Sequence, residues 1–207
     1  MPRHIFVNAL KYIDRFHHKK METDKIPPAL EFVKVEGSDV FFYCDVSQES
    51  IVELCAVMKK LERELFAGLY TLGIYDMVPT INLHIQSDGG DLNAGLGCMD
   101  FLRRLKARVV TIAEGVCASA ATFLFLGGDE RIVTQNSYIL IHQLGSEFWG
   151  NYENMKDEMK FCEQLMKQMK KVYLHETSIP ESKLDRLMKR DLYLSYKKCV
   201  MYGLTLP

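Results

Sequence analysis

Residues 81–90 have the sequence Ile-Asn-Leu-His-Ile-Gln-Ser-Asp-Gly-Gly, and this stretch decides the fold. Ile81, Leu83 and Ile85 alternate with polar residues, which is the pattern of a β-strand with one buried face. The strand stops at a turn sequence that ends in two glycines, which reach backbone conformations closed to other residues. The stretch therefore predicts a buried strand that leads directly into a tight glycine turn.

The segments on both sides of this strand alternate between strand and helix patterns. Ser50-Ile51-Val52-Glu53 has the spacing of a capping box, so a helix is expected to begin there. Strands that alternate with helices favour parallel βαβ units in one α/β domain. The expected strands cover residues 40–44, 109–112, 131–133 and 138–141, and the expected helices cover residues 50–65, 96–105, 118–126 and 151–176.

The segment 151–176 is the most periodic helix of the chain. Its apolar side chains recur every three or four residues, with charged residues between them. Such a stripe packs either against the core of the same chain or against another subunit, and the pattern alone leaves both open. The stripe consists of Met155, Met159, Cys162, Met166, Met169 and Tyr173.

The composition is that of an ordinary globular protein. A length of 207 residues allows one sizeable core, and hydrophobic residues make up 48% of the chain. A formal net charge of -1 gives no electrostatic reason to expect nucleic acid or an anionic membrane as partner. The longest apolar stretch, residues 116–126, is shorter than the roughly 20 residues that cross a bilayer.

The cysteines and the start of the chain indicate the compartment. The six cysteines form no CxxC pair and no zinc-ligand spacing, so we expect free thiols, no metal and no cofactor. The first residues lack the apolar run and cleavage site of a signal peptide. His17-His18-Lys19-Lys20 is interpreted as a solvated basic loop rather than a metal site. A cytoplasmic protein is expected.

Ser119 is the candidate nucleophile. It lies between the expected strand 109–112 and the apolar helix after it, where free N–H groups and the helix dipole favour negative charge. Taken alone, the segment favours the plainer interpretation in which Ser119 only caps the helix. The glycine-flanked nucleophile elbow of α/β-hydrolases is absent, because Cys117 and Ala121 occupy its glycine positions.

A histidine and an aspartate are the candidate partners of this serine. His142 follows the strand 138–141 and projects where that strand meets a loop. His84 lies inside its strand and is interpreted as a structural histidine. Asp191 lies between a basic pair and an apolar segment, so on local sequence it is also a surface partner of Arg190 or a helix N-cap. Each assignment is weak on its own.

Together these segments resemble the proteolytic subunit of the Clp protease family, over about residues 38–204. Residues 81–90 resemble its strand and Ser-Pro-Gly-Gly turn, and residues 115–123 resemble its segment Gly-x-Ala-Ala-Ser-x-Gly-Ala-Phe. Residues 136–143 resemble Asn-Ser-x-x-Met-Ile-His-Gln, and residues 190–195 resemble Arg-Asp-x-x-(Met/Leu)-Ser. Four motifs in the family's order, each with the required residue, make the resemblance specific.

The resemblance implies the fold and the catalytic residues of a serine endopeptidase. The fold would be the α/β ClpP/crotonase-like fold of repeated βαβ units, with a protruding handle helix at about residues 146–177. An N-terminal arm, residues 1–35, would precede a single peptidase domain, residues 36–207. Ser119, His142 and Asp191 would form the catalytic triad, and the backbone N–H groups of Gly90 and Ala120 the oxyanion hole.

The resemblance also implies how substrate and partners would bind. The segments after Gly90 (Asp91, Leu92) and after His142 (Leu144, Gly145) would flank the polypeptide substrate as strands. Leu92, Leu144 and Gly145 would contact it. Subunits would form a homo-oligomer of two stacked heptameric rings joined by the handle. An AAA+ unfoldase of the ClpX, ClpA or ClpC type would supply ATP hydrolysis, because this chain has no P-loop.

Departures from the family pattern favour a divergent member, viral or an accessory paralogue. Asp88 and Leu144 replace prolines beside the expected site, and residues 67–79 resemble an insertion on the side that receives the unfoldase. The alternatives are a non-catalytic subunit that assembles with an active paralogue, and a viral head-maturation protease of the same fold. An acyl-CoA hydratase or a signal-peptide peptidase would not explain His142 and Asp191 together.

Overall fold

In a computed structural model, which describes residues 32–206, the alternating stretch forms the strand β3 (Thr80–Ser87). Its apolar residues Ile81, Leu83 and Ile85 are fully buried, while the polar residues between them face the other side of the sheet. β3 lies between two parallel neighbours, β2 (Asp39–Phe42) and β4 (Arg108–Ala118). The predicted strand and its alternation are confirmed.

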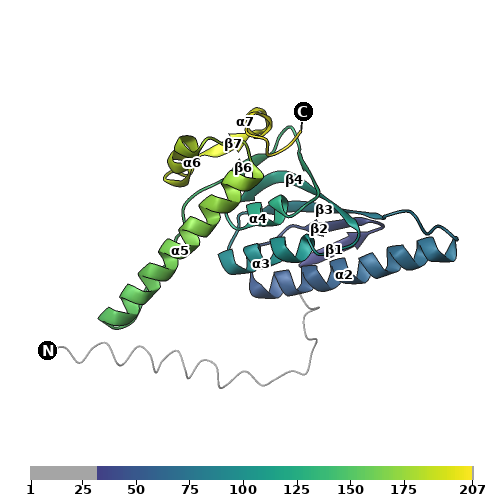
Figure 1. Ribbon diagram of the computed structural model, residues 1–207, viewed down its shortest axis with the longest axis horizontal. Coiled ribbons are helices and arrows are strands. Elements are labelled where there is room, and N and C mark those ends of the chain that lie inside the picture. Colours follow the sequence, from purple (N-terminus) through teal and green to yellow (C-terminus); the bar gives the residue numbers. More distant parts are fainter. Residues whose placement is uncertain (1–31, 207) are drawn as a thin grey trace, which may run out of the picture. The chain divides into compact units, whose positions relative to one another are not determined.

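The described residues contain seven strands, which form one sheet around β3 and β4 (Figure 1). β1 (Val33–Glu36) pairs antiparallel with β2, and β7 (Tyr193–Ser195) pairs antiparallel with β6 (Tyr138–Leu140). On the edge away from β3, β4 has two parallel partners in succession, because β5 (Glu130–Val133) pairs with its first half and β6 with its second. The centre of the sheet is parallel, as expected, and its edges are antiparallel.

β4 is longer than the expected strand 109–112, and it includes Ala118, which was expected in the helix after it. The added residues Val116 to Ala118 are paired with β6, so their backbone groups find partners that a local pattern cannot show. Gly115, with φ of +63°, lies where β4 passes from one partner to the other.

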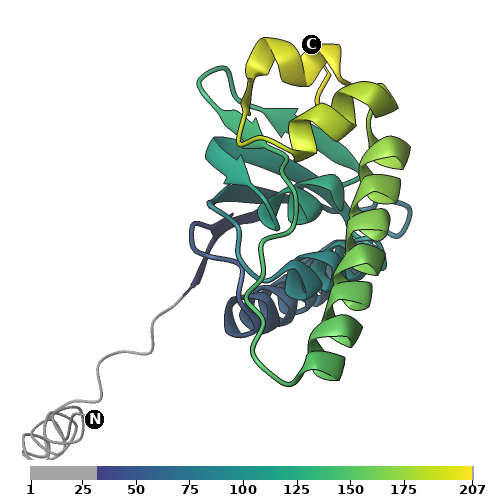
Figure 2. The same cartoon turned by 90° about the vertical axis from the view of Figure 1, so that its left-hand side faces the viewer.

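Three helices, α2 (Gln48–Thr71), α3 (Leu92–Leu102) and α4 (Ala121–Leu126), cover one face of the sheet (Figure 1, Figure 2). The main core lies between these helices and the sheet, where every residue of α4 is buried. The expected capping box at Ser50 is wrong by one turn. Ser47 is the N-cap of α2, and the Ser50 hydroxyl accepts a hydrogen bond from the Ser47 N–H at 2.9 Å.

Three further helices follow β6: α5 (Tyr152–Glu176), α6 (Glu181–Met188) and α7 (Tyr196–Met201). The first turns of α5 extend away from the sheet (Figure 1), and its buried residues are Met169 and Tyr173, near its end. The methionines of its first half, Met155 and Met159, are exposed. The apolar stripe therefore packs in the core of this chain only over the last turns of the helix.

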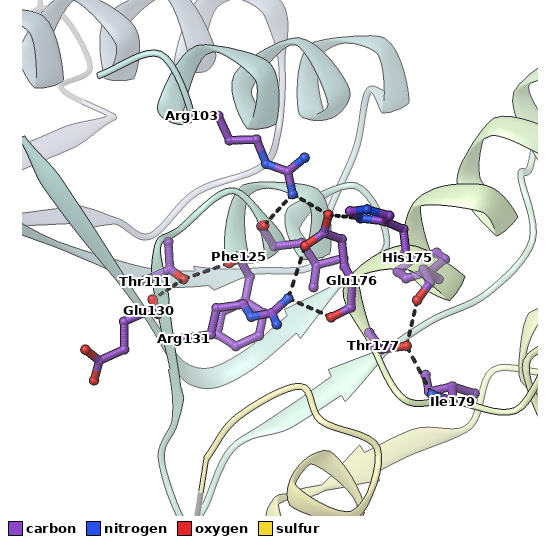
Figure 3. A network of polar contacts seen from close by, with 11 residues as sticks. Arg103, Thr111, Phe125, Glu130, Arg131, His175, Glu176, Thr177 and Ile179 are labelled. Atoms are coloured by element: carbon purple, nitrogen blue, oxygen red, sulfur yellow. Dashed lines mark hydrogen bonds and ion pairs between the residues drawn. The ribbon is translucent and has the colours of Figure 1, made fainter. Parts of the chain in front are cut away.

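The C-terminal end of α5 is attached to the body by a charged cluster (Figure 3). The Glu176 carboxylate lies 2.6 Å from Arg103 Nη2, just after α3, and 3.7 Å from Arg131 Nη1 of β5. Arg131 also donates to the Glu176 carbonyl at 2.9 Å. Burial alone would raise the pKa of Glu176, but hydrogen bonds from His175 and Arg103 hold it below its ordinary value. Glu176 is therefore an ionised anchor for the helix.

Some sequence expectations concern residues outside the described part. The N-terminal arm, residues 1–35, is described only from Phe32, and Val33 to Val35 belong to β1. The basic loop with His17 and His18 lies wholly outside the described residues. Within residues 32–206, no helix combines the length and the apolar composition needed to span a bilayer.

Candidate active site

Ser119 stands on a strained turn between the end of β4 and the start of α4. Its φ of +54° makes it the one non-glycine residue with a positive φ in the described part of the chain. Such a conformation costs of order 1–3 kcal/mol and persists only where the surroundings hold it. Here the Ser119 N–H donates to the Leu140 carbonyl at 2.9 Å, and its own carbonyl accepts from the Thr122 N–H at 3.0 Å.

The structure overturns the plainer interpretation of Ser119 as a helix cap. The N-cap of α4 is Ala120, and no side-chain hydrogen bond caps this helix. The Ser119 hydroxyl is therefore not used by the helix, and its side chain is half-buried at the surface. Cys117, two residues earlier, is no rival nucleophile, because complete burial strongly raises the pKa of its thiol.

The glycine turn after β3 lies directly against Ser119. A side chain on Gly89, whose φ is +102°, would place its Cβ 2.6 Å from the Ser119 Cβ. Gly90, with φ of +141°, is equally constrained, because its Cβ would lie 2.2 Å from the Val46 carbonyl oxygen. Both positions therefore require glycine. The buried Ser87 hydroxyl accepts from the Gly89 N–H at 3.1 Å and supports this turn.

Two backbone N–H groups beside Ser119 are left out of regular hydrogen bonding. In the bridge between Val46 and Gly90, the bonds run from the Val46 N–H to the Gly89 carbonyl and from the Asp91 N–H to the Val46 carbonyl, both at 2.7 Å. The Gly90 N–H takes no part in this bridge. The Ala120 N–H precedes the first turn of α4, where backbone donors have no intrahelical partner. These are the two predicted oxyanion donors.

His142 and Asp191 come together through the pairing of β6 with β7. The antiparallel register pairs Tyr138 with Ser195 and Leu140 with Tyr193, so the next step places residue 142 beside residue 191. His142 Nδ1 lies 3.2 Å from Asp191 Oδ1. The expected alternatives for Asp191 are not seen, since Ser195 is the N-cap of the following helix and the carboxylate pairs with the histidine.

The other ring nitrogen of His142 has no partner. Nε2 is buried and forms no hydrogen bond within the described residues, so no bond joins it to Ser119. An unpaired buried nitrogen costs about 1–3 kcal/mol. It is also free to accept a proton from a neighbouring hydroxyl. Ser119 is close in the fold, because its N–H is bonded to Leu140, two residues before the histidine.

The two segments that were expected to flank the substrate as strands do not form strands. Asp91 caps α3 by accepting from the Asn93 N–H at 2.7 Å and the Ala94 N–H at 3.0 Å. Leu92 is therefore the first residue of α3, and its side chain is buried in the core. A residue that is buried in a helix offers a peptide neither the free backbone groups of an edge strand nor an accessible side chain.

The segment after His142 also forms no strand, and its backbone contacts α5 instead. The Leu144 N–H lies 3.2 Å from the Met166 sulfur, while Gly145 is exposed. Leu144 lines a groove of about 490 Å³ between residues 143–148 and α5. The other lining residues are Gln143, Ser146, Phe148, Met159, Cys162, Glu163, Met166 and Lys167.

Other polar groups around the site have structural partners. His84 has its ring nitrogens 3.2 Å from Glu114 and 3.4 Å from Asp39, as expected for a structural histidine. The Asp88 side chain is exposed beside the glycine turn. All six cysteines carry free thiols, and residues 32–206 contain no cluster of three metal-ligating side chains.

Sequence reasoning missed two residues that contact or support the Ser119 backbone. The Thr122 hydroxyl lies 2.6 Å from the Ser119 carbonyl oxygen and 2.6 Å from the hydroxyl of Tyr173 in α5. One signal was present in the sequence, because Thr122 stands where the resembled segment has alanine. Tyr173 appeared only as a member of the apolar stripe.

Comparisons with known proteins show the family of this chain. A family model described as Clp protease matches residues 38–205. The chain is 32% identical over 150 residues to the ATP-dependent Clp protease proteolytic subunit of Deinococcus radiodurans, covering 72% of this chain and 74% of that protein. It is 30% identical over 173 residues to the ATP-dependent Clp protease proteolytic subunit 2 of Treponema denticola, covering 83% and 86%.

A solved structure is similar in fold. It is a ClpP1 point mutant from Listeria monocytogenes, with a TM-score of 0.69 and 20% sequence identity, covering 82% of this chain and 89% of that one.

Proposed function

We propose, because the chain belongs to the Clp protease family, that it is a serine endopeptidase subunit that cleaves unfolded polypeptides. The observation that carries the proposal is the pairing of His142 with Asp191, which leaves the buried Nε2 without a hydrogen-bond partner among the described residues, while the Ser119 N–H is bonded to the carbonyl of Leu140, two residues away. The strained backbone of Ser119 and the glycine turn packed against it support the same assignment, since strain of this kind is concentrated at functional sites.

The residues suggest a role for each group in acyl transfer. The Ser119 hydroxyl would attack a peptide carbonyl while its proton passes to His142 Nε2. Asp191 would hold the ring with its proton on Nδ1 and stabilise the imidazolium. The N–H groups of Gly90 and Ala120 would donate to the carbonyl oxygen as it becomes an oxyanion, an interaction worth about 2.7–4 kcal/mol per donor.

The second half of the reaction would reuse the same groups. His142 would return its proton to the leaving amine, and the acyl group would remain bonded to the Ser119 oxygen. Water would then lose a proton to Nε2 as it attacks this ester, and Ser119 would regain its hydrogen when the acid product leaves. Leu144, at the groove beside the histidine, is the residue we assign to substrate contact. Leu92 is not assigned this role because it is buried in the core.

The partners are proposed by the same reasoning. Relatives named as ATP-dependent proteolytic subunits support a ring-forming subunit that works with a separate AAA+ unfoldase. The exposed apolar residues of α5, among them Met155, Met159 and Phe161, support a contact between subunits in a two-ring assembly. A cytoplasmic location and the N-terminal arm, residues 1–35, remain predictions.

A non-catalytic subunit that assembles with an active paralogue is the second candidate. The missing hydrogen bond between Ser119 and His142 favours it, and so does the carboxylate of Asp88 beside the oxyanion donors. Catalytic hydrogen bonds often tighten only when substrate binds. The missing bond between Ser119 and His142 is therefore a weaker argument against catalysis than the chemistry of the three residues is for it. A viral head-maturation protease would use the same site.

Labelling with a fluorophosphonate tests the proposal on the full chain, with its native mass measured on the same sample. We expect the wild-type protein to be labelled at Ser119 and to cleave short peptides, and the Ser119→Ala variant to do neither. The peptidase assignment is lost if the assembled wild-type protein is not labelled while an active Clp peptidase in the same assay is. Normal cleavage by mixed rings that contain Ser119→Ala would instead favour the non-catalytic subunit.

A further inference from the structure

Two buried hydroxyl groups connect α5 to the backbone of Ser119. Thr122 Oγ1 lies 2.6 Å from the Ser119 carbonyl oxygen and 2.6 Å from the Tyr173 hydroxyl. The side chains of both residues are completely buried, and the Tyr173 ring packs on Phe123 with centroids 5.2 Å apart. The three groups therefore form a continuous chain of hydrogen bonds inside the protein.

The direction of both hydrogen bonds follows from the donors available. A carbonyl oxygen only accepts, so the Thr122 hydroxyl must donate its one hydrogen to Ser119. Thr122 must then accept from the Tyr173 hydroxyl. Burial strongly raises the pKa of Tyr173, so its hydroxyl keeps the proton that it donates to Thr122. The order is Tyr173 to Thr122 to Ser119.

The carbonyl that receives this bond belongs to the same peptide group as the Ala120 N–H. A peptide group is planar, and its C=O and N–H point in opposite directions. Holding the Ser119 carbonyl inward therefore fixes the outward direction of the Ala120 N–H, which is one of the two proposed oxyanion donors. The same bond holds the strained backbone of Ser119, whose φ is +54°.

The hydrogen bond from Tyr173 to Thr122 also depends on the position of α5. Met169 and Tyr173 are the buried residues of this helix, and Tyr173 is the one that carries a polar group. A shift of α5 that withdrew the tyrosine would remove the donor to Thr122. The peptide group after Ser119 is thus connected to a helix whose other end extends into solvent (Figure 1).

We propose that Thr122 and Tyr173 are positioning residues, which aim the Ala120 N–H and hold Ser119 only while the end of α5 is seated on α4. The inference rests on the proposed peptidase function, because an aimed oxyanion donor matters only to a reacting carbonyl. It assigns to α5 an influence on the rate of acylation in addition to any role in assembly.

The test uses four single variants of the full chain. Thr122→Val and Tyr173→Phe each remove one hydroxyl and keep the shape of the side chain, while Thr122→Ser keeps the hydroxyl. Thr111→Val is the matched control. The Thr111 hydroxyl is also buried and donates to a carbonyl of α4, that of Phe125 at 2.7 Å (Figure 3), at the end of the helix away from Ser119.

We expect Thr122→Val to lower the fluorophosphonate labelling rate by about three- to ten-fold, the range of one buried hydrogen bond. Tyr173→Phe should have a smaller effect in the same direction. With a peptide substrate the loss should fall on kcat and leave KM unchanged. Thr122→Ser and Thr111→Val should label at nearly the wild-type rate. The double variant Thr122→Val/Tyr173→Phe should be no slower than Thr122→Val, because the bonds act in series.

Equal slowing by Thr111→Val would overturn the inference, since the hydroxyl of Thr122 would then serve stability alone. A Thr122→Ser rate as low as that of Thr122→Val would also overturn it, since the hydroxyl would then not set the rate. Hydrogen exchange at the amides of residues 122 and 123 gives a second readout that needs no activity. Faster exchange is expected in Thr122→Val and Tyr173→Phe but not in Thr111→Val. If the wild-type protein is not labelled, the peptidase proposal fails. Unchanged hydrogen exchange in Thr122→Val and Tyr173→Phe would separately reject the connection between α5 and Ser119.

Discussion

Replacing Asp191 by asparagine should weaken the site without disturbing the fold. The substitution removes one negative charge and keeps the size of the side chain. Asp191 lies after α6 and before β7, and 78% of its side-chain surface is exposed. Its one ion pair among the described residues is with His142, at 3.2 Å. The change therefore acts on the imidazole and on little else.

The exposure of Asp191 sets the expected magnitude. A unit charge about 4 Å from another contributes about 1 kcal/mol in bulk water and about 4 kcal/mol near a protein surface. A carboxylate this exposed lies toward the water limit. Stabilisation of the imidazolium should therefore fall by about 1–2 kcal/mol, which lowers the rate about five- to thirty-fold. A buried triad aspartate changed to asparagine loses about 10⁴-fold.

The assay is the second-order rate of fluorophosphonate labelling, measured near neutral pH and again at raised salt. Screening should make the wild-type rate salt-sensitive and leave the Asp191→Asn rate less so. Thr111→Val, which is distant from the histidine, serves as the folding control. An unchanged labelling rate in Asp191→Asn would show that the carboxylate takes no part in the reaction. A loss near 10⁴-fold would refute the reasoning from exposure and show that the active form buries Asp191.

Three further predictions concern stability, measured by urea unfolding. Ser119→Gly should be more stable than Ser119→Ala by about 1 kcal/mol, because glycine adopts the positive φ without a Cβ penalty; equal stabilities would show that the turn relaxes. Gly89→Ala should lower the free energy of unfolding by at least about 3 kcal/mol and abolish labelling, since its Cβ would meet Ser119 at 2.6 Å; a stable, labelled variant would show that the turn can move away. Burial opposes ionisation of Glu62, but hydrogen bonds from Lys59 and from the backbone N–H groups of residues 106 and 107 lower its pKa below 4.5. Its stabilisation is present above the unfolded pKa and is lost as the pH falls through the folded one, so Glu62→Gln should flatten the acid side of the stability curve; an unchanged slope would contradict this.

Local patterns predicted the centre of the sheet because one face of it is buried. Ile81, Leu83 and Ile85 had to alternate for β3 to pack against the helices, so their spacing was enough. The boundaries were less predictable. The added residues of β4 are strand because β6 supplies partners, and the capping box of α2 begins at Ser47 because Ser50 serves as its N3 residue.

Sequence reasoning named the candidate residues of the site but not the contacts that connect them to the rest of the chain. Resemblance of motifs named Ser119, His142 and Asp191 as candidates, and the register of β6 with β7 explains why the last two meet. The same resemblance misplaced the substrate-flanking strands, since the cap at Asp91 starts a helix instead. The contact between Thr122 and Tyr173 joins residues 51 positions apart, and no local pattern contains it.

The pairing of β7 with β6 also sets the order in which the site is completed during synthesis. Ser119 and His142 leave the ribosome before Asp191, so a growing chain has the proposed nucleophile and base without the strand that holds the carboxylate. A chain that ends anywhere between β6 and β7 is left in the same condition. Copies that stop before β7 would therefore lack the third member of the proposed triad, and full activity would arise only once the chain is complete.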